Sequence, residues 1–118
     1  MRMSRIIPML PVSNMPASVA FYQKLGFSVE QRNDQWRWAM LRLDGCRLMV
    51  DESINASTLG PPSSVLYLYP EDIRDYHQQL RANGLELPDL ERSFYGMTEL
   101  RMEDPDGNRL WIGQQDPA

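Results

Sequence analysis

A seven-residue pattern occurs twice in this chain. DGCRLMV occupies residues 44–50 and DGNRLWI occupies residues 106–112, so the second copy begins 62 positions after the first. An Asp-Gly pair before alternating apolar residues is a strong hairpin signal, because glycine accepts the positive φ of a tight turn. Strand-like segments precede both copies, QWRWAMLRL at 35–43 and MTELRMED at 97–104. Each copy is therefore predicted to be the second arm of a β-hairpin.

Two further segments have the start and stop signals of helices. In SNMPASVAFYQKLGF (13–27), Ser13 or Asn14 can cap the first turn, and Gly26 suits the left-handed C-terminal position. PEDIRDYHQQLRANGLE (70–86) repeats this design and ends near Gly84. A strand-like segment precedes and follows each helix. These segments are IIPMLPV and FSVEQR around the first helix, and SVLYLYP and LELPDL around the second.

The chain therefore has the element order strand, helix, strand, strand, strand, written twice. SVAFYQKL and IRDYHQQL also align without a gap, which argues against a chance match of two Asp-Gly hairpins. We predict an internal duplication. The predicted fold is α+β in one domain, residues 1–118, with βαβββ modules at 1–53 and 64–118 and the linker INASTLGPPS at 54–63.

Composition narrows the range of partners. The 118 residues suit one small domain, and no apolar run reaches the roughly 18 residues that a membrane span needs. MRMSRIIPML lacks the apolar core of a signal peptide, so a cytoplasmic location is expected. The lone Cys46 has no cysteine with which to form an internal disulfide and is expected to act as a small hydrophobe. A net charge of -4 argues against nucleic acid and favours a neutral or cationic small molecule.

The most specific segments resemble a known family. PVSNMPASVAFYQKLGF near the start and YGMTELRMEDPDGNRLWIGQ near the end are similar to the vicinal oxygen chelate superfamily, in its glyoxalase/bleomycin resistance branch. The resemblance covers essentially the full length. It implies that the two βαβββ modules form a curved mixed sheet around a cavity, and that two copies pair as a homodimer.

The resemblance also implies where a metal ion would bind. Metalloenzymes of the superfamily hold a divalent ion with His and Glu side chains from the first and fourth strand of each module. The matching positions here are Ile7, Met49, Val65 and Trp111. None of these side chains suits a divalent cation, which prefers imidazole nitrogen or carboxylate oxygen. The single histidine, His77, is expected on the surface of the second helix. We therefore predict no metal and no cofactor, as in the metal-free drug-binding members.

Strand alternation predicts which side chains would line the cavity. Neighbours two positions from the ligand positions share their face of the sheet, and these are Met9, Arg47, Asp51, Tyr67, Tyr69 and Arg109. Trp36 and Trp38 share one face of the predicted third strand, where they either stack on a flat ligand or pack against a helix. The predicted ligand-binding residues are Trp36, Trp38, Met49, Tyr67, Tyr95 and Trp111.

Two functions remain open at this point. The favoured one is binding and sequestration of a drug-like, cationic or aromatic molecule, as in antibiotic resistance, with no catalytic residue. The alternative is a lyase, isomerase or dioxygenase of the same superfamily, with non-standard metal ligands or a carboxylate base. Glu99 is the notable carboxylate, and a solvated strand side chain or a structural ion pair is the simpler interpretation of it.

Overall fold

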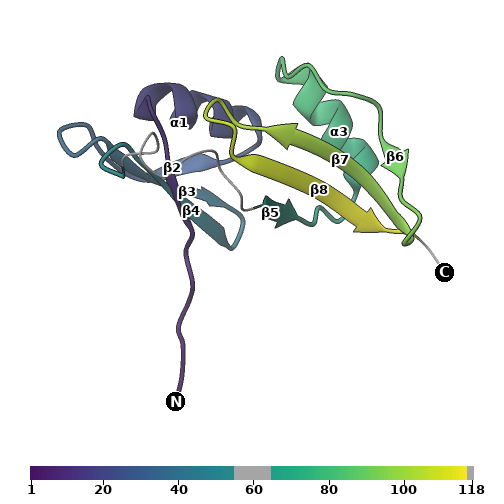
Figure 1. Ribbon diagram of the computed structural model, residues 1–118, viewed down its shortest axis with the longest axis horizontal. Coiled ribbons are helices and arrows are strands. Elements are labelled where there is room, and N and C mark those ends of the chain that lie inside the picture. Colours follow the sequence, from purple (N-terminus) through teal and green to yellow (C-terminus); the bar gives the residue numbers. More distant parts are fainter. Residues whose placement is uncertain (55–64, 117–118) are drawn as a thin grey trace. The chain divides into compact units, whose positions relative to one another are not determined.

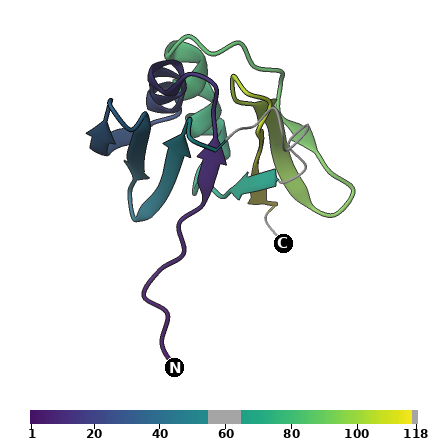
Figure 2. The same cartoon turned by 60° about the vertical axis from the view of Figure 1, so that its left-hand side comes forward.

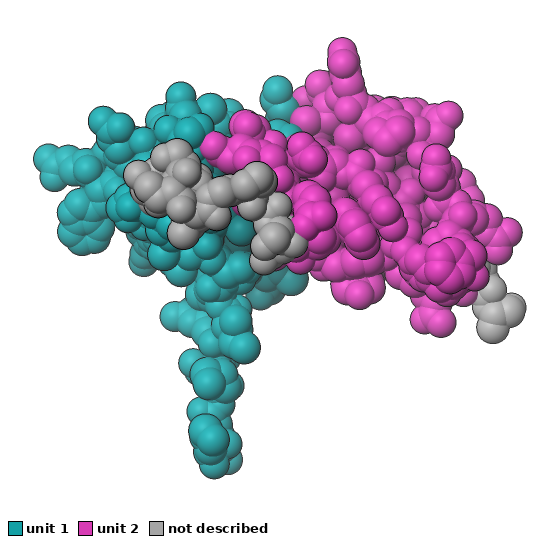
Figure 3. Space-filling view, viewed as in Figure 1, with its two compact units in different colours: residues 1–61 teal, residues 62–118 magenta. Residues whose placement is uncertain are grey.

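The structure is a computed structural model that describes residues 1–54 and 65–116. The chain divides into two compact units, residues 1–61 and 62–118, which Figure 3 shows in different colours. The predicted linker lies outside the described residues except for Ile54. In the part of the chain that the structure describes, no helix has the length and apolar character needed to cross a membrane.

The described residues of the first unit form a helix and a four-stranded sheet (Figure 1). Its elements are β1 Met9–Pro11, α1 Met15–Lys24, β2 Ser28–Asn33, β3 Trp38–Leu43 and β4 Cys46–Asp51. The strand order is β1-β4-β3-β2. β1 runs parallel to β4, while the pairs β2–β3 and β3–β4 are antiparallel. The sheet is therefore mixed, and the first predicted hairpin is confirmed as β3 and β4.

The second unit repeats this topology. Its elements are β5 Val65–Leu68, α3 Ile73–Ala82, β6 Glu91–Arg92, β7 Met97–Glu103 and β8 Arg109–Gln115. The strand order is β5-β8-β7-β6, and only the β5–β8 pair is parallel. Strand, helix and three strands thus occur in the same order in both units, and the predicted α+β fold is confirmed.

The helix signals in the sequence are also confirmed. Asn14 caps α1, where its side chain accepts from the Ala17 amide, and Asp72 caps α3 in the same way. Gly26 and Gly84 follow the two helices with φ of 108° and 95°. The two caps are 58 positions apart, and so are the two glycines. The structural match of the two helices is therefore shifted by about one helical turn from the ungapped alignment of SVAFYQKL with IRDYHQQL. This shift makes Tyr22 the counterpart of Leu80, which is likewise fully buried.

Each helix covers one face of its own sheet (Figures 1 and 2). In the first unit the buried side chains are mainly apolar, and they include Tyr22, Leu41 and Val50. In the second unit Leu110 and Ile112 are fully buried. Because side chains alternate along a strand, the residues between these core positions lie on the opposite face. Among the described residues, no helix of the same unit covers that face. We call these two surfaces the open faces.

Two expectations about the second unit are wrong. LELPDL does not form a strand, and only Glu91–Arg92 pairs with β7. Pro88 in this segment has no amide hydrogen to donate to a sheet. His77 is buried at 7% exposure rather than lying on the surface. Its Nε2 donates to the Pro88 carbonyl at 2.8 Å, so the histidine fixes this irregular segment against α3.

The third strand is shorter than predicted. β3 begins at Trp38, and Trp36 lies in the preceding turn, so the two indoles do not share a face of one strand. Arg37 between them has a φ of 55°, which is incompatible with an extended strand. β1 is likewise limited to Met9–Pro11, and the residues before it extend away from their own sheet (Figure 2).

Candidate functional site

A row of three side chains crosses the open face of the second unit. Tyr67 on β5 pairs with Trp111 on β8, and Trp111 pairs with Arg101 on β7. The rings of Tyr67 and Trp111 meet edge to face with centroids 6.5 Å apart. The Arg101 guanidinium carbon lies 3.8 Å from the centroid of the Trp111 ring. A cation therefore already covers the indole, in the geometry of a cation–π contact.

A third ring extends this surface toward solvent. Tyr69 stacks on Tyr67 with centroids 4.6 Å apart and an angle of 27° between the rings. Tyr69 is 71% exposed, whereas Tyr67 and Trp111 are half-buried. The open face thus offers flat apolar surface at its edge, where another planar molecule can stack.

Glu99 lies beside this row and is buried at 7% exposure. Its Oε2 accepts a hydrogen bond from the Tyr67 hydroxyl at 2.5 Å, and its Oε1 accepts one from the Tyr95 hydroxyl. Tyr95 belongs to the loop before β7, so the carboxylate connects three separate segments of this unit. Of the two simpler interpretations of Glu99, the solvated strand carboxylate is wrong, because two phenol groups take the place of water around it, whereas an ion pair is present with Arg101.

Gly113 makes the contact between Tyr67 and Glu99 possible. Gly113 pairs with Glu99 across the β7–β8 ladder. A Cβ placed on Gly113 would lie 2.2 Å from the Tyr67 hydroxyl oxygen, far inside van der Waals contact. The glycine therefore leaves the space through which the tyrosine reaches the carboxylate.

Burial raises the pKa of Tyr67 well above its usual value, and the hydrogen bond to Glu99 and its charge raise it further. Tyr67 accordingly stays a neutral hydroxyl donor across the physiological pH range. Arg101 supplies the opposite charge, with its Nη2 3.8 Å from Glu99 Oε1. The site thus combines one shielded carboxylate, two phenol donors and one cation that is 55% exposed.

The first unit has a separate concavity of about 520 Å³. Trp36, Trp38, Asp51 and Ser53 line it. Trp36 is 71% exposed, and Asp51 accepts from the Ser53 amide at 2.6 Å. The two predicted tryptophans therefore do come together, although one belongs to a turn and the other to β3.

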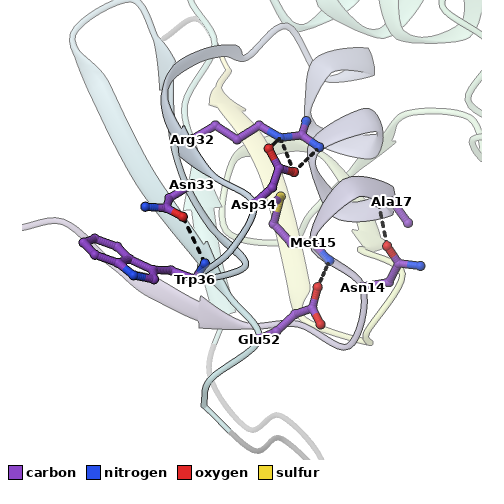
Figure 4. A network of polar contacts seen from close by, with 8 residues as sticks. All are labelled: Asn14, Met15, Ala17, Arg32, Asn33, Asp34, Trp36 and Glu52. Carbon is purple, nitrogen blue, oxygen red and sulfur yellow. Dashed lines mark hydrogen bonds and ion pairs between the residues drawn. The ribbon is translucent and has the colours of Figure 1, made fainter.

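Polar contacts hold the turn that carries Trp36 (Figure 4). The Asn33 side chain accepts from the Trp36 amide at 3.0 Å. Glu52 accepts from the Met15 amide at 2.7 Å and pairs with Arg37 at 3.1 Å, so it ties the turn to the start of α1. The hydrogen bond from Met15 holds the pKa of the Glu52 carboxyl below its usual value. The indole of Trp36 is consequently presented to solvent on an ordered turn.

Three methionines form a row on the open face of the first unit. Met9 on β1 pairs with Met49 on β4, and Met49 pairs with Met40 on β3. Met9 is exposed, and the other two are half-buried. Met49, a predicted ligand-binding residue, is therefore surrounded by flexible thioether side chains that can adapt to an apolar surface.

The structure brings part of the predicted site together. Tyr67 and Trp111 are in direct contact, and Tyr95 reaches the same cluster through Glu99. Arg47, expected to face a cavity, is paired with Glu30 at 2.7 Å. Arg101 was missed as a site residue, and Glu99 was considered only as a carboxylate for the alternative enzyme function. They lie two positions apart on β7, and the alternation that identified Tyr67 could have placed both on the same face.

The side chains at the four positions that the family resemblance assigns to metal ligands do not fit a divalent ion. Ile7 and Val65 carry no donor atom, and Met49 offers only a soft thioether. At the fourth position, the Trp111 ring is covered by the positive charge of Arg101, which would repel a metal ion. In the described residues, no three His, Cys, Asp or Glu side chains are grouped as metal ligands would be.

A family model identifies the chain. The model described as "Glyoxalase/Bleomycin resistance protein/Dioxygenase superfamily" matches residues 5–112. The chain belongs to this superfamily. No curated protein sequence matches it.

Several solved structures have the same fold. A bleomycin resistance determinant encoded on the transposon Tn5 is 22% identical, with a TM-score of 0.79, and the match covers 98% of this chain and 100% of that one. A bleomycin-binding protein solved in complex with bleomycin is 22% identical, with a TM-score of 0.76 and coverages of 97% and 100%. Lactoylglutathione lyase from Agrobacterium tumefaciens is 18% identical, with a TM-score of 0.71 and coverages of 96% and 95%.

Proposed function

We propose that this protein binds and sequesters a small organic molecule that has a flat aromatic part and a positive charge, and that it leaves the molecule unchanged. The observation that carries this proposal is the open face of the second unit, where Tyr67 and Tyr95 donate to the buried carboxylate of Glu99 and Trp111 packs against Tyr67. Aromatic faces attract both planar rings and cations, and a shielded carboxylate attracts a cation more strongly than one in water.

Two further observations support a binding role. The first is that the first unit offers more stacking surface, on the exposed indole of Trp36 and in the concavity that Trp36 shares with Trp38. Met49 in the same unit adds a flexible apolar side chain that can adapt to a ligand. The bleomycin-binding protein with the same fold was solved with bleomycin bound. At 22% identity this likeness supports the class of ligand, and the identity of the ligand has to come from experiment.

The test is a titration of the protein with metal-free bleomycin, followed by tryptophan fluorescence and calorimetry. We expect saturable binding with quenched fluorescence, and recovery of intact bleomycin by mass spectrometry. Trp111→Ala should weaken binding by about 1 to 3 kcal/mol, the range for a buried aromatic contact. Trp38→Ala tests the concavity of the first unit in the same way. Glu71→Ala, an exposed residue just before α3, is the matched control and should leave the affinity unchanged.

Three outcomes would contradict this proposal. The first is a failure of bleomycin and of a panel of smaller aromatic cations to bind at millimolar concentration. The second is chemical conversion of the ligand, and the third is a stoichiometric divalent metal ion in protein purified without chelator. The second or the third outcome would favour the lyase, isomerase or dioxygenase alternative.

We also propose that the protein forms a homodimer. Within residues 1–54 and 65–116, both sheets end in edge strands that pair with no further strand, and such edges are commonly covered by a second chain. Met3 and Ile6 support this proposal, because these large apolar side chains are exposed on the extended segment before β1. Sedimentation at micromolar concentration should give about twice the chain mass of 13.7 kDa, and a species of 13.7 kDa alone would contradict the dimer.

A further inference from the structure

The Arg101 guanidinium occupies the place where a cationic ligand would bind. It lies 3.8 Å from the Trp111 ring centroid and 3.8 Å from Glu99 Oε1, so it contacts both groups that would attract such a ligand. We propose that Arg101 is an internal stand-in for the ligand, and that a guanidinium or amidinium group takes its place between Trp111 and Glu99. This inference rests on the proposed binding function and names the chemical class that the site selects.

The shape of the site favours a planar cation. A guanidinium or amidinium is flat, so it covers an indole face while its N–H groups point sideways toward a carboxylate. Arg101 shows that this geometry is available, because it is the cross-strand partner of Trp111 and lies two residues from Glu99 on β7. An alkylammonium is compact and strongly hydrated, so it satisfies the carboxylate but covers little of the ring.

Arg101 is also easy to displace. Its side chain is 55% exposed, and 3.8 Å between Nη2 and Oε1 is longer than a hydrogen bond. Turning the guanidinium into water gives up a weak ion pair and its contact with the Trp111 ring, and an incoming planar cation replaces both contacts. Glu99 keeps acceptor capacity for a new donor, because an ionised carboxylate has about four lone-pair sites and the two tyrosines use one on each oxygen.

This arrangement makes Arg101 a specificity-determining residue. While it covers Trp111, a cationic ligand has to displace it and also approaches a like charge. Removing the positive charge should therefore strengthen the binding of a planar cation, which is the opposite of what loss of an ordinary contact residue would do. The first unit has methionines at the matching places, Met49 for Trp111 and Met40 for Arg101, so this subsite is specific to the second unit.

The experiment uses phenylguanidinium as the planar cation and phenylurea as its neutral isostere. Both are titrated into the full-length protein and its Arg101→Met and Arg101→Gln variants by calorimetry and tryptophan fluorescence. We expect both variants to bind phenylguanidinium about tenfold more tightly than the wild type, a gain in the range of one desolvated cation–π contact. Phenylurea should gain no more than about threefold, because it cannot use the charge of Glu99.

Two further variants separate this mechanism from a general change in charge. Arg92→Met also removes one positive charge, but from β6, where Arg92 pairs with Thr98 and so lies on the face opposite Arg101. This variant should leave phenylguanidinium binding unchanged within about twofold. Glu99→Gln combined with Arg101→Met should lose the tenfold gain, because the carboxylate that attracts the cation is gone. Circular dichroism of each variant confirms that it is folded.

The possible failures are distinguishable. If bleomycin binds the wild type but Arg101→Met leaves phenylguanidinium affinity unchanged or weaker, the stand-in role of Arg101 is wrong and the proposed function stands. An equal gain for phenylurea would mean that Arg101 only shields the ring, which also overturns the inference. If neither the wild type nor Arg101→Met binds bleomycin or phenylguanidinium, the proposed function itself is wrong.

Discussion

The two open faces have the same backbone and different chemistry. In the first unit the row across β1, β4 and β3 reads Met9, Met49, Met40, and in the second unit the matching row across β5, β8 and β7 reads Tyr67, Trp111, Arg101. The first row is soft and apolar. The second is aromatic and charged, and it lies beside a buried carboxylate. The two units therefore have the same strand pairing, while the side chains on their open faces suit different contacts.

A second pair of positions shows how this difference arises. Trp38 pairs with Asp51 in the first unit, and Glu99 pairs with Gly113 at the matching place in the second. The carboxylate thus lies on β4 in the first unit and on β7 in the second, where its cross-strand partner is a glycine instead of an indole. Because Gly113 has no Cβ, the Tyr67 hydroxyl passes over it to Glu99. One small residue therefore decides whether a polar network can form on the open face.

Other features are shared by both units. Glu52 accepts from the amide of Met15, the first residue of α1, and Gln114 accepts from the amide of Ile73, the first residue of α3. Glu52 and Gln114 are 62 positions apart, like the two DG repeats. Both units therefore have a hydrogen bond between the end of the hairpin and the start of the helix, whereas the side chains on their open faces differ.

The largest expected effect concerns the helix anchors, Tyr22 and Leu80. Both are fully buried and lie at matching positions of α1 and α3. Tyr22→Ala should lower the free energy of unfolding by about 4 kcal/mol and Leu80→Ala by about 3 kcal/mol, because each leaves a cavity in its core. Urea unfolding measures both, with the exposed Gln23→Ala as a control that changes stability by less than about 0.5 kcal/mol. A loss below about 1 kcal/mol in either variant would show that the two helices are not anchored alike.

Gly113→Ala should have the next largest effect. The new methyl group would overlap the Tyr67 hydroxyl, so we expect a loss of about 1 to 3 kcal/mol of stability and displacement of Tyr67 from Glu99. Gly45→Ala is the matched control, because in the described part of the chain a Cβ there would have no heavy atom within 4 Å beyond its chain neighbours. Equal stability of the two variants would contradict the role given to Gly113. A spectroscopic titration that finds the pKa of Tyr67 unchanged from the wild type in Gly113→Ala would contradict it too, because losing the hydrogen bond to Glu99 should lower that pKa.

The smallest effect concerns the shared hydrogen bond to each helix start. Glu52→Ala and Gln114→Ala should each lower stability by about 1 kcal/mol at neutral pH. The folded protein lowers the pKa of Glu52 below the ordinary value of 4.5, so its contribution is present above that pH and is lost as the pH falls through the folded pKa. Gln114 does not titrate. The effect of Glu52→Ala should therefore shrink in acid while that of Gln114→Ala persists, and parallel pH profiles would contradict this difference.

The sequence by itself determined the duplicated element order and the family. Two Asp-Gly turns, the caps Asn14 and Asp72, and two glycines after the helices act over a few residues, so they can be recognised without knowing what packs against them. The family resemblance and strand alternation together also placed Tyr67 and Trp111 on one face, and the two residues are cross-strand neighbours in the structure. These signals sufficed because they depend on backbone geometry within one turn or one strand.

The tertiary structure decided the polar chemistry of the site. Tyr67 and Glu99 are 32 positions apart and meet only because Gly113 leaves room between β5 and β7. His77 is buried because an irregular segment eleven residues later offers it the carbonyl of Pro88. Whether a carboxylate is solvated or shielded by two tyrosines, and whether an arginine rests on an indole, depends on neighbours that strand pairing brings from distant segments. A periodic pattern contains no information on such contacts, because it specifies the face on which a side chain lies and not what lies opposite.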